Sequence, residues 1–592
     1  MPTLRRAAPV VLAILVALLL SSLGRAAGAD TGGSGQPGGA GEGSRQARPA
    51  EGQARPAVGP VGIDPLPGDD VRPNIVVIMA DDMRDDEVQY MPNVQRLIAD
   101  QGVRFVNTFS PQPLCCPARA SFLTGMYSHN HKVWSHADPF GFRVFHDAQT
   151  LPVWLSEVGY NTGFLGKYLN GYGRQTLRDG SPSVHYVPPG WTDWSGSVDS
   201  GIQDEAYNGG TYRYFDTTLN VDGTLVPHQG RYNTEVFGER SLDLIERYAQ
   251  SPKPFFLWAS YVAPHHGAPA EPDDPGVVLR DNGDTTDFKT PARSESVKGM
   301  FDDEITRAPG ADGEEDVSDK PFFIRDLPEL NQAERDALTE VSRQRAEALF
   351  ALDEQVGRTM QALKETGELD NTLVVFTSDN GYFLGEHRDR QGKILPYEPS
   401  LRVPLLMRGP GIPAGQVRRD PFLMIDFAAT FLDAAGAQPR ADVDGASLWD
   451  VARDGDRGWT RGILTETGPR HVSNDVGESD NFLVLGGGPS PLRFSQGMRV
   501  PHYLYVEHAS REKELYDLRT DPAEDHNLVD RPAVRHVQSE LARLLDELRN
   551  CVGAECRIPL PQDLRGTESG FAAAKLRHAA AAGGAGAQTP TP

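Results

Sequence analysis

The stretch Asn74-Ile-Val-Val-Ile-Met-Ala80, followed by Asp81-Asp82, decides how the fold is interpreted. Its continuous run of apolar, mostly β-branched residues is typical of a strand buried on both faces, as in a parallel sheet. Two adjacent carboxylates at the end of such a strand repel each other unless a cation lies between them, so we expect a metal ion there. The alternative for Asp81 and Asp82 is a helix N-cap beside a surface acid.

Apolar strands and amphipathic helices alternate from about residue 74 to residue 440. Residues 171–250 are rich in Gly and Tyr, so we expect them to be irregular, and residues 267–330 are charged and Pro-rich, as in an insertion. The remaining pattern indicates an α/β fold with a mainly parallel central sheet flanked by helices. The strands are expected at 74–80, 161–166, 254–262, 372–377 and 403–407, and the helices at 91–102, 117–124, 151–158, 333–366 and 425–436.

Polar side chains follow four of these strands at the point where each strand ends. In parallel sheets ligands collect at the carboxyl ends of the strands. Any one of these residues alone has an ordinary structural explanation, but their shared location argues for one site. The oxygen ligands among them suit Ca²⁺ or Mg²⁺ better than zinc. The residues are Asp81, Asp82, Lys167, His265, Asp379 and Asn380.

The stretch Pro113-Leu-Cys-Cys-Pro-Ala-Arg-Ala-Ser-Phe-Leu-Thr-Gly125 is expected to be a loop that enters a helix. Pro117 suits a first helical turn and Gly125 suits a helix end. Cys115 would then lie at a helix N-terminus, which favours an anion or a thiolate. The guanidinium of Arg119 suits a tetrahedral oxyanion. The alternative is a buried structural pair formed by Cys115 and Cys116.

The pattern Cys115-x-Pro117-x-Arg119, with Leu-Thr-Gly125 in register, resembles the signature of the sulfatase family. The resemblance implies an alkaline-phosphatase-like fold. It also implies that a formylglycine-generating enzyme converts Cys115 to 3-oxoalanine (formylglycine), an aldehyde whose hydrate is the nucleophile. The chain departs from the family in having Met126, where Arg or Lys usually follows Leu-Thr-Gly.

Further motifs extend the resemblance over roughly residues 73–530. Asp81-Asp82 and Ser378-Asp379-Asn380-Gly381 resemble the metal-binding segments of the family, and Glu514-Leu-Tyr-Asp-Leu518 resembles its C-terminal signature. The segments that resemble its substrate contacts are Gly-Lys167-Tyr-Leu-Asn, Ala-Pro-His265 and Gly-Lys393-x-x-x-Tyr-Glu.

The resemblance assigns a role to each of these residues. The implied metal ligands, for Ca²⁺ or Mg²⁺, are Asp81, Asp82, Cys115, Asp379 and Asn380. Arg119 would support the hydrate, Lys167 and Lys393 would bind sulfate, and His265 would protonate the leaving alcohol. Many sulfatases have a second His two residues after the Lys, where this chain has Leu169. His129 and His131 are the candidates for that vacant role.

The expected activity is hydrolysis of a sulfate ester, either an aryl sulfate or a sulfated sugar. Cys-Cys-Pro117, Tyr127-Ser-His-Asn-His131 and Gly166-Lys-Tyr-Leu-Asn170 look most like the glucosamine-6-sulfatase branch. Two alternatives stay open. One is a phosphonate monoester or phosphodiester hydrolase of the same fold, and the other is a non-catalytic binder of sulfated glycans in which Cys115 is never converted.

Composition limits the partners of the 592-residue chain. Its net charge of −24 argues against nucleic acid or an anionic membrane as the main partner. An anionic substrate must therefore be attracted by a locally basic pocket.

Residues 1–29 are expected to be a secretory signal, with Arg5 and Arg6 ahead of an apolar run and a small-residue cleavage site at Ala27-Gly28-Ala29. The alternative, a membrane anchor, is disfavoured because the run is short. We therefore predict a secreted protein whose mature chain has no membrane span. Cys551 and Cys556 are expected to form a disulfide bond, and Cys115 and Cys116 to remain separate thiols.

The expected domain boundaries follow from composition. They are a disordered linker at 30–72, a catalytic domain at 73–450, a smaller C-terminal α+β domain at 451–560 and a flexible tail at 561–592. Within the smaller domain we expect strands at 482–485, 502–506 and 514–522, and a helix at 536–548.

Overall fold

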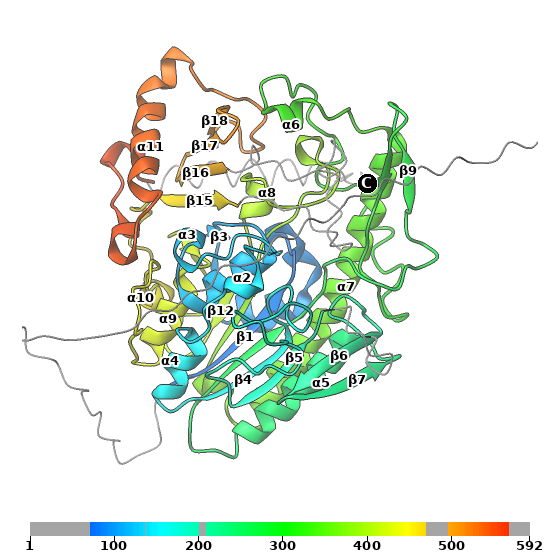
Figure 1. Ribbon diagram of the computed structural model, residues 1–592, viewed down its shortest axis with the longest axis vertical. Helices are drawn as coiled ribbons and strands as arrows, with labels where there is room; N and C mark the ends of the chain where they lie inside the picture. The colour runs from blue at the N-terminus through cyan, green and yellow to red at the C-terminus, as the bar shows by residue number, and fades with distance from the viewer. Residues whose placement is uncertain (1–71, 137, 200–208, 469–494, 567–592) are drawn as a thin grey trace, which may run out of the picture. The chain divides into compact units, whose positions relative to one another are not determined.

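The computed structural model describes residues 72–136, 138–199, 209–468 and 495–566. Its main feature is a ten-stranded sheet in the order β13-β2-β12-β11-β1-β8-β4-β5-β6-β7 (Figure 1). The predicted signal at 1–29, most of the linker, the strand at 482–485 and the tail beyond 566 lie outside the described residues.

The central strand β1 (Asn74–Ala80) pairs in parallel with β11 (Thr372–Ser378) on one side and β8 (Phe255–Ser260) on the other. Next to β8 come β4 (Asn161–Lys167) and β5 (Asp193–Ser197), also in parallel. Five adjoining strands therefore run in one direction, which confirms the prediction of a mainly parallel sheet.

Shorter strands extend both edges of this parallel core. On one side, β12 pairs antiparallel with β11 and with β2, and β13 pairs in parallel with β2. On the other side, β6 pairs antiparallel with β5, and β7 pairs antiparallel with β6. The bounds are β12 Leu405–Arg408, β2 Val103–Phe105, β13 Gln416–Arg418, β6 Asp216–Val221 and β7 Thr224–Gln229.

Helices cover both faces of the sheet, and the side chains of β1 alternate between them. Val76 and Ile78 pack in the core with α5 (Asn233–Tyr248) and α7 (Gln332–Glu365). Val77 and Met79 pack on the opposite face with three helices, α2 (Cys115–Thr124), α4 (Leu151–Glu157) and α9 (Asp426–Ala434). β1 is thus buried on both faces, as its apolar run predicts.

The expectation that residues 171–250 are irregular is wrong in part. This segment supplies β5, β6, β7 and α5, which complete one side of the sheet. β5 has the sequence Asp-Trp-Ser-Gly-Ser and lacks an apolar run, yet all five residues are buried. Trp194 stacks on Phe164 of β4 with ring centroids 4.5 Å apart, so packing between strands overrides a weak local pattern.

The helix predicted at 91–102 also differs from the structure. Only α1 (Pro92–Val94) is α-helical, and a π-helical turn follows at Gln95–Ala99. The other predicted helices are found as α2, α4, α7 and α9. The long helix α7 begins with the N-cap Asn331, whose side chain accepts a hydrogen bond from the backbone of Glu334.

A second, antiparallel sheet forms the C-terminal part in the order β15-β16-β17-β18. Its strands are β15 (Ile463–Thr467), β16 (Ser495–Val500), β17 (Tyr503–His508) and β18 (Lys513–Asp517), and α11 (Arg535–Leu548) packs beside it (Figure 1). This confirms the predicted C-terminal α+β part, whereas the boundaries at 450/451 and 560/561 stay predictions.

The predicted disulfide bond between Cys551 and Cys556 is present. Cys115 and Cys116 are buried free cysteines, also as predicted. The remaining short elements are α3 Ser128–His131, α6 Phe322–Arg325, α8 Glu398–Leu401, α10 Trp449–Asp454, β3 Thr108–Phe109, β14 Phe422–Leu423, β9 Val277–Leu279 and β10 Thr285–Asp287.

No helix in the described part of the chain has the length and apolar character needed to cross a membrane.

Gly166 precedes Lys167 at the end of β4, where its φ is +92° and an added Cβ would lie 1.9 Å from the carbonyl oxygen of Ser260. We expect Gly166→Ala to lower the free energy of unfolding by about 4 kcal/mol or more, because strain and a backbone clash act together. The matched control is Gly180→Ala, which has a similar φ of +85° but open space. The control should lose only about 1–2 kcal/mol. Equal losses of unfolding free energy in Gly166→Ala and Gly180→Ala, measured by urea unfolding, would contradict the clash.

Candidate active site

The polar residues predicted at strand ends come together at one edge of the parallel core. Asp81 and Asp82 follow β1, and Asp379 and Asn380 follow its neighbour β11, in a register that pairs Ala80 with Ser378. Lys167 ends β4, and His265 lies shortly after β8. All six are buried. With three residues from other segments they form what we call the Cys115 site, comprising Asp81, Asp82, Cys115, Arg119, Lys167, His265, Asp379, Asn380 and Lys393.

Cys115 is the first residue of α2 and is fully buried. Its Sγ lies 3.3 Å from Asp81 Oδ1 and 3.5 Å from Asp82 Oδ1. Lys393 Nζ approaches the same sulfur to 2.9 Å. The helix ends at Gly125 with φ +70°, as predicted. The structure therefore places the cysteine at a helix N-terminus, against the paired carboxylates.

Each of the three buried aspartates faces a different cation. Lys167 forms an ion pair with Asp81. Lys393 Nζ lies 2.7 Å from Asp82 Oδ1, and Arg119 Nε lies 2.7 Å from Asp379 Oδ2. Pairing of this kind is what allows charged groups to be buried.

Arg119 holds three chain segments together. Besides Asp379, it donates to the backbone oxygen of Lys167 at 2.7 Å and to Ser260 Oγ at 2.6 Å. The guanidinium thus links α2 to the ends of β11, β4 and β8.

Asp82 has a left-handed backbone with φ +65°. Its N–H donates to Asp379 Oδ1 at 3.1 Å, and its carbonyl accepts from Arg345 at 2.6 Å. A non-glycine residue in this conformation is strained, and such strain persists only when surrounding contacts hold it. Here the conformation lets two consecutive carboxylates face the same site.

His265 is oriented by its neighbours. Its Nδ1 donates to the carbonyl of His266 at 2.7 Å, and its Nε2 lies 3.6 Å from Asp82 Oδ2. Its ring stacks on Tyr212 with a centroid distance of 4.4 Å. Tyr212 also lies 4.9 Å beneath Lys167 Nζ and accepts a hydrogen bond from Asn170 at 2.6 Å. Tyr212 lies in the Gly- and Tyr-rich segment, which carries no motif from which its place in the site could be predicted.

Burial and charge act against each other on the ionisable groups. Burial raises the pKa of Asp81, but the ammonium of Lys167 and the other cations outweigh it, so this pKa lies well below its usual range. Burial and then the charge of Asp81 raise the pKa of the Cys115 thiol. The same two causes raise the pKa of Asp379. An unmodified Cys115 is therefore a neutral thiol at pH 7.

The oxygen donors of this site, two carboxylates and one amide, fit a hard divalent cation. Ligand atoms of Asp81, Asp82, Cys115 and His265 all lie within 4.8 Å of one another. Asn380 Nδ2 donates to Asp82 Oδ1 at 2.7 Å, while its buried Oδ1 has no hydrogen-bond partner among the described residues. Carboxylate and amide oxygens are the ligands that Ca²⁺ and Mg²⁺ prefer.

Asp379 stands slightly apart from the four residues of that cluster. Its Oδ1 accepts from the backbone of Asp82 and Asn380, and its Oδ2 accepts from Arg119. It joins the cluster through these hydrogen bonds.

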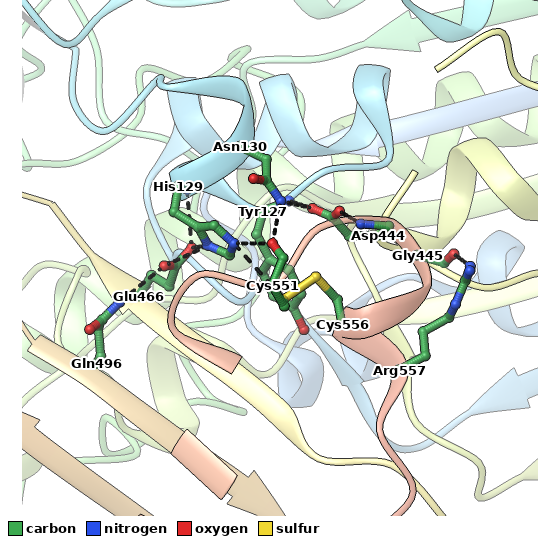
Figure 2. The surroundings of a disulfide bond; sticks show 11 residues. Tyr127, His129, Asn130, Asp444, Gly445, Glu466, Gln496, Cys551, Cys556 and Arg557 are labelled. Carbon is green, nitrogen blue, oxygen red and sulfur yellow. Dashed lines mark hydrogen bonds and ion pairs between the residues drawn. A yellow bond between two sulfur atoms is a disulfide. The ribbon is translucent and has the colours of Figure 1, made fainter. Parts of the chain in front are cut away.

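The two histidines considered for the vacant role make their hydrogen bonds elsewhere. His129 bridges Glu466 Oε1, 3.0 Å from Nδ1, and the carbonyl of Cys551, 2.8 Å from Nε2, as Figure 2 shows. His131 Nε2 lies 3.0 Å from Ser121 Oγ, and its Nδ1 accepts from the backbone of Val133. These hydrogen bonds join α3 to α2 and to the C-terminal part, and neither histidine bonds to a residue of the Cys115 site within the described ranges.

Comparisons with known proteins agree with this geometry. The model of the family described as "Sulfatase" matches residues 73–437. The chain is a member of the sulfatase family. The arylsulfatase of Volvox carteri is 32% identical over 523 residues, spanning 82% of this chain and 76% of that protein. The N-acetylglucosamine-6-O-sulfatase of Bacteroides thetaiotaomicron is 28% identical, spanning 80% of this chain and 86% of that protein.

A solved structure of a protein in complex with its substrate D-glucosamine-2-N,6-O-disulfate superposes with a TM-score of 0.62. It is 24% identical and covers 81% of this sulfatase and 97% of that chain, so the likeness concerns the fold. The fold is thus the alkaline-phosphatase-like one, and family membership makes the protein a sulfuric ester hydrolase.

Burial and the nearby charge of His129 lower the pKa of His131 to about 3. A His with a lowered folded-state pKa contributes stability that is complete above its unfolded pKa of about 6.5 and declines as the pH falls. When the pH falls from 6.5 to 4.5, protonation of His131 in the unfolded state should therefore lower the free energy of unfolding by about 2–3 kcal/mol. In His131→Asn, the free energy of unfolding measured in urea should fall by about 2–3 kcal/mol less than in the wild type over this pH range.

The control for this experiment is His526→Asn, because the side chain of His526 is 81% exposed. It should leave the pH dependence of the unfolding free energy unchanged. An unchanged pH dependence in His131→Asn would show that His131 is not held neutral in the folded state.

Proposed function

We propose that this sulfatase is a secreted enzyme that hydrolyses sulfate esters with a formylglycine made from Cys115 and a bound divalent metal. The observation that carries the proposal is the convergence, in one buried site, of Cys115, three carboxylates and three cations from distant segments. Neither a structural cysteine pair nor a surface acid accounts for that convergence.

The metal would be held by carboxylate oxygens of Asp81, Asp82 and Asp379 and by the amide oxygen of Asn380, with Cys115 beside them. Ca²⁺ is the first candidate and Mg²⁺ the second, because the donors are oxygens. When bound, such an ion stabilises negative charge on oxygen and lowers the pKa of a hydroxyl next to it.

Cys115 supplies the nucleophile only after conversion. Burial and the carboxylate of Asp81 hold the pKa of its thiol well above the usual range, so a thiolate is disfavoured there. An aldehyde at the same position carries no charge that burial would penalise, and its hydrate offers a hydroxyl. The partner implied for maturation is a formylglycine-generating enzyme, and the close Arg119 would support the converted residue.

The charges of the site suit an anionic substrate. Asp81, Asp82 and Asp379 are balanced by three cations, namely Lys167, Arg119 and Lys393. A divalent ion added to this balanced set makes the site positive. Such a site would supply the local positive charge that a protein of net charge −24 needs to attract a sulfate monoester. Lys167 and Lys393 are the two ammonium groups placed to bind sulfate oxygens.

His265 is proposed as the general acid for the leaving alcohol. Because its Nδ1 proton is donated to the carbonyl of His266, only Nε2 can exchange a proton with a substrate. That nitrogen lies on the side of the site, 3.6 Å from Asp82 Oδ2. The stacking on Tyr212 fixes the plane of the ring.

The substrate class is proposed to be a sulfated sugar or an aryl sulfate, in line with the names of the relatives. Secretion is proposed from the signal-like residues 1–29 and from the Cys551–Cys556 disulfide, which is typical of oxidising compartments. The experiment below also distinguishes this activity from the two alternatives named from the sequence, a phosphonate monoester or phosphodiester hydrolase and a non-catalytic glycan binder.

Cys115→Ala should fold normally and lose all detectable turnover of an aryl sulfate, because the reacting group is gone. In the wild-type protein, the peptide that contains Cys115 should be lighter than its unmodified mass by the difference between a thiol and an aldehyde. Mass spectrometry of the digested protein and rates on an aryl sulfate measure both effects.

The adjacent Cys116 offers a matched control, since Cys116→Ala removes a buried thiol without removing the modified residue. It should keep most of the activity. Unmodified Cys115 in active enzyme, or undiminished activity in Cys115→Ala, would contradict the proposal. A faster rate on an aryl phosphodiester than on an aryl sulfate would favour the phosphodiesterase rival.

A further inference from the structure

A second cluster of ionisable side chains shares no residue with the Cys115 site. Glu314 comes from the insertion, His387 from the short helix η6 (Glu386–Arg388), and Asp525 from the turn after β18. Carboxylate oxygens of Glu314 and Asp525 and a ring nitrogen of His387 lie within 4.8 Å of one another. The proposed sulfate chemistry uses none of these residues.

The imidazole of His387 is oriented like that of a metal ligand. Its Nδ1 lies 2.8 Å from Glu314 Oε2, so this nitrogen carries the proton and donates it to the carboxylate. The other nitrogen, Nε2, then has a free lone pair. It is buried, has no hydrogen-bond partner within the described ranges, and lies 4.0 Å from Glu524 Oε2. Metal-binding histidines are commonly held by a carboxylate in this way.

Glu524 faces His387 from the C-terminal part and is fully buried. Its Oε2 accepts from the backbone N–H of Glu398 at 2.9 Å. Its Oε1 has no hydrogen-bond partner in the part of the chain that the structure describes. The nearby guanidinium of Arg499 is already paired with Glu398 at 2.6 Å. A buried carboxylate oxygen of this kind normally has a donor or a cation.

The charges of the cluster are not balanced by its own cation. Lys320 Nζ lies 2.6 Å from Glu314 Oε1 and also donates to the backbone oxygen of Asp525. Lys320 therefore balances Glu314. The carboxyl group of Glu524 then remains 4.0 Å from His387 Nε2 with no Lys or Arg ion-pair partner among the described residues, and Asp525 belongs to the same cluster.

We propose that His387 Nε2, Glu524 and Asp525 bind a second divalent metal ion, with Glu314 orienting the imidazole. Bonds from zinc to nitrogen and oxygen are about 2.0–2.2 Å, so two ligands of a tetrahedral zinc ion lie about 3.4 Å apart. His387 Nε2 and Glu524 Oε2 are 4.0 Å apart, so binding the ion would draw these two atoms closer together. One imidazole with carboxylates suits Zn²⁺ better than Ca²⁺.

This ion would fix the loop that leads to Lys393. His387 and Lys393 belong to the same loop between β11 and α8, and Glu524 and Asp525 belong to the C-terminal part. His387 and Arg388 have left-handed backbones, with φ of +52° and +60°, so the loop is held in a strained conformation. Binding the ion joins these two segments without contacting the reacting groups.

Zinc content per chain tests the proposal directly. The full-length protein is dialysed against zinc in a weakly chelating buffer and measured by inductively coupled plasma mass spectrometry. His387→Gln and Glu524→Gln should each lose one equivalent of zinc relative to the wild type. The matched control is His508→Gln, which also removes a buried His paired with a glutamate, here Glu514 at 2.5 Å. It should lose none.

A variant of the Cys115 site separates the two metal sites. Asp82→Asn should keep the His387-dependent zinc, and zinc should raise its melting temperature. That rise should vanish in Asp82→Asn/His387→Gln. Equal zinc content in wild type, His387→Gln and Glu524→Gln would overturn the proposal, as would loss of all zinc in Asp82→Asn. If circular dichroism shows that His387→Gln does not fold, the zinc content per chain of Glu524→Gln and Asp525→Asn decides the outcome instead.

Discussion

The structure depends on pairing three buried carboxylates with three buried cations. Asp81, Asp82 and Asp379 have no exposed side-chain surface, and removing one partner of such a pair typically costs about 3–5 kcal/mol. The partners come from β1, β11, β4, α2 and the loop before α8. None of these segments can move away without leaving a charge unpaired in the interior, so the pairs also fix the relative positions of the segments that carry the site.

The same pairing explains how an acidic protein can have a site for an anion. The six charges cancel, so the site has little net charge until a divalent ion is added. The field that attracts a sulfate ester would then be local and short-ranged, since exposed charges elsewhere are screened within about 8–10 Å at physiological salt. The strained backbone of Asp82 serves the same end, because it lets consecutive side chains face the ion together.

Much of this site could be predicted from the sequence, because the chemistry is concentrated at strand ends. The apolar run of β1 identified a strand buried on both faces, and a parallel sheet places strand ends at one edge. The strand β5 could not be predicted, since its burial comes from partners such as Phe164 on another strand. Tyr212 and the role of His129 depend on contacts between segments far apart in the chain, which no local pattern encodes.

The most direct test of this account is an anomalous difference map from crystals of the mature protein grown with Mn²⁺. Manganese accepts the same oxygen ligands as Ca²⁺ and Mg²⁺ and scatters anomalously. The account predicts a peak bounded by the side chains of Asp81, Asp82, Asp379 and Asn380, next to a residue 115 that has lost its sulfur. A map with no peak among these four side chains, in crystals of active enzyme, would contradict it.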